Sequence, residues 1–264
     1  MSNNIRPFVL KETNWKSVKK EDYQIAILPW GATEAHNFHL PYGTDTYLAE
    51  EVAILSAEKA WGKGVKAVVL PPVPFGVNTG QIDIPLCLNM NPSTQLALLK
   101  DLLLVIKKSG IQKLVIFNAH GGNHFKQMIR EVYLEFPDIF VCALNWWQVQ
   151  PAEKFFKEPG DHAGELETSA IMYLFPELVL PLEQAGDGKS FPFNLKAIQE
   201  GWVSTQRVWS KATRDTGVGN PQFSTSENGR RFIEEVSGSV AEFFEELGGL
   251  SLEDLYSDSQ AEQN

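Results

Sequence analysis

The chain of 264 residues carries 33 Asp and Glu against 23 Lys and Arg, a formal charge of −10, and 43% of its residues are hydrophobic. This composition is typical of a globular protein with a substantial core, and it excludes a disordered chain. The acidic balance argues against nucleic acid and anionic membranes as partners.

The negative charge is concentrated near the C-terminus. Between Phe232 and Asn264 lie nine acidic residues and no Lys or Arg, which leaves 24 acidic against 23 basic residues in 1–231. We therefore expect a nearly neutral body. The acidic residues are expected on a solvated face of the last helix and on a polar tail, away from any catalytic site.

Cysteine usage and hydropathy predict a cytoplasmic protein in a reducing compartment. Cys87 and Cys142 are too few for a disulfide framework, and the apolar run around Cys142 predicts that its side chain is buried. The N-terminal residues contain no apolar stretch typical of a secretory signal. No apolar run approaches the ~20 residues that a membrane span requires.

Strand and helix patterns alternate along the first half of the chain. Runs rich in Val, Ile and Leu predict strands buried on both faces at residues 24–29, 66–70, 113–117 and 140–144. Helical patterns cover residues 45–60, 92–108, 123–136, 164–174 and 226–247. This alternation predicts a layered α/β domain with a mostly parallel sheet and right-handed crossovers.

Beyond residue 144 the pattern is less regular. Residues 181–225 are rich in Gly, Pro, Ser and Asn and are typical of loops. No repeat or linker divides the chain, so we expect one domain over residues 1–248, followed by a polar acidic tail over 249–264. The adjacent Trp146 and Trp147 are expected to wall the pocket; the alternative is that one of them faces the core.

Histidines and carboxylates gather in three places. The first follows the first strand and holds Glu34, His36 and Asp45; the second follows the third strand and holds His120; the third opens the 164–174 helix and holds His162, Glu165 and Glu167. Glu34 and His36 are two residues apart, so their side chains point the same way in extended backbone. Taken alone, each of these residues could also be a helix cap, a solvated acid or part of a turn.

The joint pattern indicates a metal site. Loops beyond the carboxyl ends of parallel strands converge on one crevice, so the first two clusters can meet there. Histidine and carboxylate ligands suit Zn²⁺, Mn²⁺ or Fe²⁺ rather than Ca²⁺. The set exceeds what one catalytic ion needs, and a carboxylate can bridge two ions, which leads to the hypothesis of a two-metal hydrolytic site.

At these positions the sequence resembles the creatininase (creatinine amidohydrolase) family. The matching segments are Glu34-Ala35-His36, Gly43-Thr44-Asp45, Asn118-Ala119-His120-Gly121-Gly122-Asn123, His162-Ala163-Gly164-Glu165-Leu166-Glu167-Thr168-Ser169, Gly217-Val218-Gly219-Asn220-Pro221 and Glu227-Asn228-Gly229-Arg230-Arg231. The resemblance covers residues 20–235. It implies a single-domain, three-layer α/β/α fold with a two-metal centre, often in a hexamer, and hence a homo-oligomer.

The resemblance also implies a ligand set. Glu34, Asp45 and His120 would hold one ion, and His36 and Asp45 would hold the other, with Asp45 bridging. In creatininase the second ion takes a glutamate two residues after the histidine that matches His120, where this chain has Gly122.

A glutamate from the 164–174 helix is expected to fill this gap. Glu167 is the first candidate because it matches the glutamate of the family's Glu-Thr-Ser segment, and Glu165 is the second. His162 matches a histidine that handles protons, whereas His39 and His124 are expected to be supporting or structural residues.

The predicted function is hydrolysis of a non-peptide amide C–N bond, in a cyclic amide or formamide, by a water activated between two divalent ions. His162 would protonate the leaving nitrogen. The alternatives are a peptide-cleaving maturase of the same family and a non-catalytic metal-binding assembly protein, against which the complete ligand set argues. A two-metal phosphoesterase would need an arginine clamp, for which Arg214 is the one candidate.

Two stretches depart from the family pattern. Where the family carries a Ser and a His, this chain has Phe75-Gly76-Val77-Asn78-Thr79-Gly80-Gln81, and a Pro-Gly-Thr is replaced by Pro85-Leu86-Cys87. Both stretches are expected to border the pocket, which argues against creatinine itself as the substrate.

Overall fold

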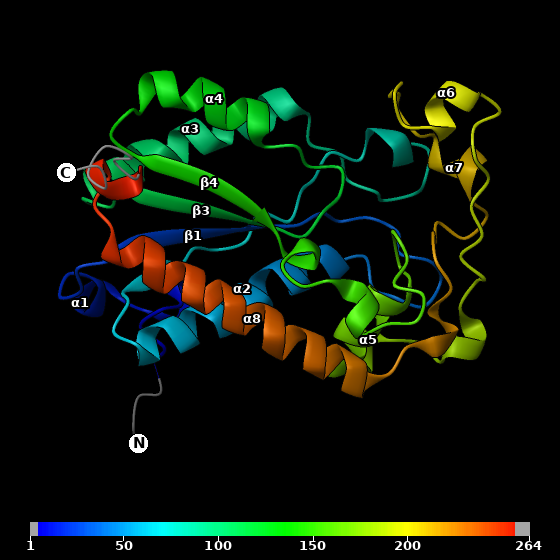
Figure 1. The fold of residues 1–264 in the computed structure, drawn as a ribbon, viewed down its shortest axis with the longest axis horizontal. Coiled ribbons are helices and arrows are strands. Elements are labelled where there is room, and N and C mark those ends of the chain that lie inside the picture. Colours follow the sequence, from blue (N-terminus) through cyan, green and yellow to red (C-terminus); the bar gives the residue numbers. More distant parts are fainter. Residues whose placement is uncertain (1–4, 257–264) are drawn as a thin grey trace, which may run out of the picture.

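The computed structural model describes residues 5–256 and contains a parallel sheet in the order β2-β1-β3-β4 (Figure 1). The strands are β1 (Ile25–Trp30), β2 (Ala67–Val69), β3 (Lys113–Asn118) and β4 (Phe140–Asn145). All three strand pairs are parallel, with Ala26 opposite Val68 and Leu114. The predicted parallel sheet is confirmed. Of the expected polar tail, residues 257–264 lie outside the described residues.

Within residues 5–256, five long helices connect and follow the strands. They are α2 (Thr44–Gly62), α3 (Pro92–Lys108), α4 (Lys126–Glu135), α5 (Glu165–Leu174) and α8 (Ser226–Gly249). Three one-turn helices are also present: α1 (Trp15–Val18), α6 (Lys196–Gln199) and α7 (Trp209–Ala212). Each long helix lies where the sequence predicts one, and α8 runs two residues beyond its predicted end.

The sheet separates two apolar cores, and the alternation of side chains along β1 shows how. Ile25 and Ile27 pack against the cluster that contains α2, α5 and α8. Ala26 and Leu28 point the other way and pack with α3 and α4. Figure 1 shows these two helix layers on opposite faces of the sheet. The three-layer α/β/α fold is therefore confirmed, and β1 and β2 are apolar and buried along their whole length because helices cover both faces of the sheet there.

The strand β4 is less buried than expected because β3 is its only partner among the described strands. Its residues are only partly covered, and Cys142 is partly exposed rather than buried. The prediction of a buried Cys142 is wrong for this reason. Among residues 5–256, no helix is long and apolar enough to cross a membrane.

The close crossing of α5 and α8 depends on a glycine. A Cβ atom added at Gly229 would collide with the backbone oxygen of Ser169, whereas one added at Gly238, also in α8, would have only Lys59 Nζ near it, at 4.0 Å. Gly229→Ala is expected to lower the free energy of unfolding by about 2 kcal/mol, because packed backbone must move apart. Gly238→Ala should leave it unchanged or raise it by up to about 1 kcal/mol. Chemical denaturation of both variants checks this; equal stabilities would contradict it.

Candidate metal centre

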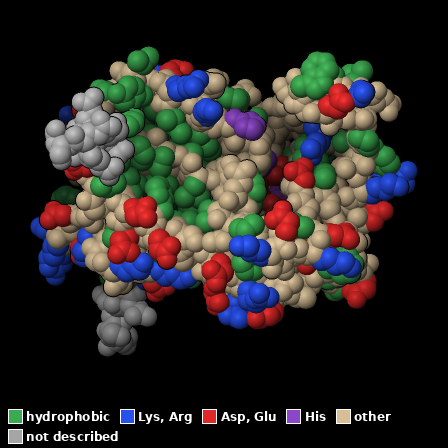
Figure 2. Space-filling model, viewed as in Figure 1, with side chains coloured by type: hydrophobic (Ala, Val, Ile, Leu, Met, Phe, Trp, Pro, Cys, Tyr) green, Lys and Arg blue, Asp and Glu red, His purple; other side chains and the backbone are tan. Residues whose placement is uncertain are grey.

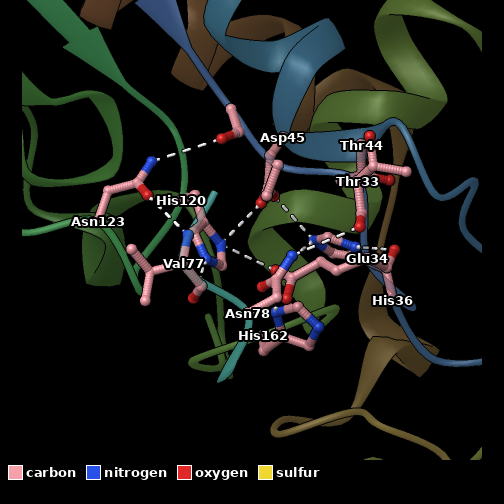
Figure 3. A network of polar contacts seen from close by, with 12 residues as sticks. Thr33, Glu34, His36, Thr44, Asp45, Val77, Asn78, His120, Asn123 and His162 are labelled. Atoms are coloured by element: carbon pink, nitrogen blue, oxygen red, sulfur yellow. Dashed lines mark hydrogen bonds and ion pairs between the residues drawn. The ribbon is translucent and has the colours of Figure 1, made fainter. Parts of the chain in front are cut away.

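The carboxyl ends of β1 and β3 and the first turns of α2 and α5 meet at one buried cluster (Figure 3). The loop after β1 supplies Glu34 and His36, and the loop after β3 supplies His120. Asp45 lies in the first turn of α2 and Glu167 in that of α5, where the helix dipole favours a carboxylate. Segments far apart in the sequence therefore converge, because the two strands are neighbours in the sheet.

The donor atoms are close enough to share cations. His120 Nδ1 lies 3.0 Å from both Glu34 Oε1 and Asp45 Oδ2. His36 Nε2 lies 2.9 Å from Asp45 Oδ1. Ligand atoms of Glu34, Asp45 and His120 all lie within 4.8 Å of one another, and so do those of His36, Asp45 and Glu167. Asp45 belongs to both groups.

The hydrogen bonds of the histidines determine which nitrogen faces the carboxylates. His120 Nε2 lies 3.1 Å from the carbonyl oxygen of Val77, and His36 Nδ1 lies 3.2 Å from that of Glu34. A carbonyl oxygen only accepts, so these ring nitrogens carry the hydrogen. In neutral histidine the other nitrogen then points a lone pair at carboxylate oxygens. This arrangement, with one N–H on a backbone carbonyl, is typical of metal-binding histidines.

The electrostatics of the cluster favour added positive charge. Burial opposes protonation of His36, but Asp45 raises its pKa to about 10. Burial likewise opposes the charged form of His120, whereas Glu34 and Asp45 raise its pKa well above the usual value. Asp45 Oδ2 is buried and has no hydrogen bond among the described residues. A cation between these groups would satisfy both the orphaned oxygen and the nitrogen lone pairs, so the residues fit divalent metal ions.

Of the two glutamates in the first turn of α5, only Glu167 faces the cluster. Its Oε2 accepts a hydrogen bond from the backbone N–H of Ala163 at 2.6 Å, and burial raises its pKa to about 7. Glu165 is buried elsewhere, where its Oε2 accepts from the backbone N–H of Glu158 at 2.7 Å. The two carboxylates point apart because they are two residues apart on a helix.

The structure also shows why position 122 is a glycine. A Cβ atom at Gly122 would collide with both His120 Nε2 and the carbonyl oxygen of Val77. Any side chain there would break the hydrogen bond that orients His120. A glutamate could therefore not be added at this position without moving the histidine.

His162 packs between two other rings, both tilted to its own, beside the cluster. Its ring centroid is 4.1 Å from that of His36 and 4.7 Å from that of Trp209. Its Nε2 lies 2.9 Å from the carbonyl oxygen of Ala35, and its Nδ1 lies 3.8 Å from Glu34 Oε1. Burial and the neighbouring His36 lower the pKa of His162. Its free nitrogen is therefore Nδ1, on the side of the carboxylates.

The cluster opens into a cavity of about 510 Å³. Figure 2 shows a hollow between the main body and the part of the chain that carries α6 and α7. Trp147 lines the cavity whereas Trp146 is fully buried against Phe232, so the alternative in which one of the two faces the core is confirmed. The exposed His124 lies at the cavity, and the buried His39 lies 2.8 Å from the hydroxyl of Thr168.

Several residues at the cavity differ from the expectation. The arginine that lines it is Arg207, whereas Arg214 lies over the ring of Phe191. Trp209, which packs on His162, belongs to the loop-rich region and carries no motif that would have identified it. The stretch 75–81 contributes Val77, Asn78 and Gly80 to the lining, but the stretch 85–87 contributes nothing to it. The prediction that both stretches border the pocket is therefore wrong for the second.

The chain is similar to proteins of one family. A family model described as creatininase (creatinine amidohydrolase) matches residues 11–244. The structure of a protein from Bacteroides fragilis NCTC 9343, provisionally described as a creatinine amidohydrolase, is 42% identical, with a TM-score of 0.90 over 97% of this chain and 100% of that one. The mycofactocin precursor peptide peptidase of Mycobacterium ulcerans is 28% identical over 222 residues, 80% of each chain. A creatininase described with Mn is 22% identical, with a TM-score of 0.76 over 93% of this chain and 100% of that one.

Proposed function

This chain belongs to the creatininase family, and from that premise we propose that it hydrolyses a non-peptide amide C–N bond, in a cyclic amide or formamide, at a centre of two divalent ions. Zn²⁺, Mn²⁺ and Fe²⁺ suit its donors. The observation that carries the proposal is the orientation of His36 and His120. Each places one N–H on a backbone carbonyl and turns its other nitrogen toward buried carboxylates.

Each ion has a proposed set of ligands. Glu34, Asp45 and His120 would hold the first ion, and His36, Asp45 and Glu167 the second, with Asp45 shared through its two oxygens. The assignment of Glu167 rests on its place beside His36 and Asp45. No glutamate can stand at position 122 without moving a ligand.

The chemistry follows from the placement of the side chains. Divalent ions bound by such ligands lower the pKa of water and polarise a carbonyl group. His162 is proposed to accept a proton at Nδ1 from the attacking water and to pass it to the leaving nitrogen, because its Nε2–H is engaged by the carbonyl oxygen of Ala35. Packing between the tilted rings of His36 and Trp209 holds the imidazole in place for this transfer.

A second candidate is cleavage of a peptide amide. The cavity of about 510 Å³ has room for a group much larger than a formamide, and one similar protein is described as a peptide peptidase. The stretch 75–81 departs from the family pattern, and its residues Val77, Asn78 and Gly80 line the cavity, which argues against creatinine as the substrate. A homo-oligomer, a hexamer by resemblance, and a cytoplasmic location stay predictions.

The test is a substrate screen of protein reloaded with Mn²⁺ or Zn²⁺, using cyclic amides, N-formyl compounds and short peptides. We expect turnover of a non-peptide amide, and we expect His162→Gln to keep the metal but lose about 100-fold or more in kcat. Product formation is followed by chromatography and metal content by elemental mass spectrometry. Turnover of peptides alone would favour the second candidate. Bound metal without any hydrolysis would favour a non-catalytic metal-binding protein.

A further inference from the structure

A line of hydrogen bonds reaches Glu34 from outside the cavity. The backbone N–H of Ala35 donates to Cys87 Sγ at 3.2 Å, and the Cys87 thiol donates to Gln81 Oε1 at 3.2 Å. Gln81 Nε2 in turn donates to Glu34 Oε2. Gln81 is 1% exposed, Cys87 7% and Glu34 1%. Neither Gln81 nor Cys87 is among the residues that line the cavity.

These hydrogen bonds allow only one orientation of the Gln81 amide. A glutamine offers one oxygen that accepts and one nitrogen that donates. Because the thiol donates to Oε1, the nitrogen must face Glu34. A hydrogen bond from a buried amide to a carboxylate is stronger than one between neutral groups, and without it Glu34 Oε2 would be left unpaired.

The consequence for Glu34 is that its two oxygens have different roles. Oε2 is occupied by Gln81, whereas Oε1 lies 3.0 Å from His120 Nδ1, 3.9 Å from His36 Nε2 and 3.8 Å from His162 Nδ1. Only Oε1 therefore faces the histidines of the metal centre. The carboxylate cannot rotate to present both oxygens without breaking its bond to Gln81.

We propose that Gln81 is a positioning residue that restricts Glu34 to a single inward-facing oxygen, and that Cys87 holds Gln81 in the orientation required. The inference rests on the proposed function, in which Glu34 is a metal ligand. The two stretches that depart from the family pattern thus meet behind Glu34. Gln81 comes from the first stretch, and Cys87 stands where the pattern has the Thr of Pro-Gly-Thr.

The test is a titration of metal-free protein with Co²⁺, whose visible absorption reports the geometry and number of its ligands. Gln81→Leu removes the donor and the acceptor but keeps an uncharged side chain of similar volume. It is expected to weaken Co²⁺ binding by about 10–100-fold, the usual effect of removing a hydrogen-bond partner of a metal ligand, and to change the visible spectrum. Melting of the metal-free variant shows whether the fold is kept.

A matched pair at position 87 keeps the inference testable if Gln81→Leu fails to fold. Cys87→Ser retains both a donor for Gln81 and an acceptor for Ala35, so it should bind Co²⁺ with the wild-type spectrum. Cys87→Ala loses both groups and should shift the spectrum and the affinity in the direction of Gln81→Leu.

Two results would overturn the inference while leaving the proposed function intact. One is a Gln81→Leu protein with wild-type Co²⁺ affinity and spectrum. The other is an identical spectrum for Cys87→Ala and Cys87→Ser. If the wild-type protein takes up no Co²⁺ at all, the metal centre itself is contradicted, and the role of Gln81 with it.

Discussion

Replacing Asp45 with asparagine is expected to remove both metal ions from the protein and to abolish hydrolysis. Asp45 Oδ1 lies 2.9 Å from His36 Nε2, and Oδ2 lies 3.0 Å from His120 Nδ1, so one side chain serves both proposed ion positions. The amide removes the negative charge and turns an NH₂ group toward one of them. Removing a residue that only hydrogen-bonds to a metal ligand typically lowers activity by roughly 10–100-fold. Because Asp45 is itself a proposed ligand of both ions, we expect kcat/KM to fall by more than this, by about 1,000-fold or more.

The control for Asp45→Asn is the same chemical change at Asp101, an exposed residue of α3. Asp101→Asn should retain two ions per chain and full activity. Elemental mass spectrometry after dialysis against a weak chelator gives the metal content, and circular dichroism reports the fold. Two tightly held ions in Asp45→Asn would disprove the bridging role.

Replacing Glu167 with glutamine is expected to remove one ion and leave the other. Ligand atoms of Glu167 group with those of His36 and Asp45, whereas the other proposed position, at Glu34, Asp45 and His120, does not include it. The glutamine can still accept the hydrogen bond from Ala163, so the turn before α5 should be kept. We expect a stoichiometry near one ion per chain and a loss of about 100-fold or more in kcat, because one of two cooperating ions is missing.

Glu165→Gln is the matched control, because Glu165 lies in the same helical turn, is buried, and also accepts from a backbone N–H. It should keep two ions. If Glu165→Gln loses an ion and Glu167→Gln does not, the ligand assignment between these two glutamates is reversed. If both variants keep two ions, the second position is completed by a different residue.

Local sequence patterns predicted the fold well because the strands and helices depend on local features. Continuous apolar runs identify strands covered on both faces. A proline at the first helical position, followed by apolar residues at helical spacing, identifies α3 from Pro92 to Lys108. The clustering of Glu34, His36 and His120 was also predictable. Histidines and acids that directly follow strands must lie at the carboxyl edge of a parallel sheet.

Contacts between distant segments could not be predicted in this way. Trp209 reaches His162 because the chain around α7 packs against Gly80, where a Cβ atom would collide with the backbone oxygen of Arg207. The Gln81–Glu34 bond joins residues 47 positions apart. No periodic pattern in the sequence indicates either contact, and the composition of the region before α7 indicates only loops.

The spread of the donors along the chain has a consequence for biosynthesis. Glu34, Asp45 and His120 lie before β4, whereas Glu167 lies after it, in α5. A nascent chain emerging from the ribosome therefore presents every ligand of the first proposed position before any part of α5 exists. The second position is completed only when the first turn of α5 packs against the cluster. The ligands of the first proposed position are thus all synthesised before those of the second are complete.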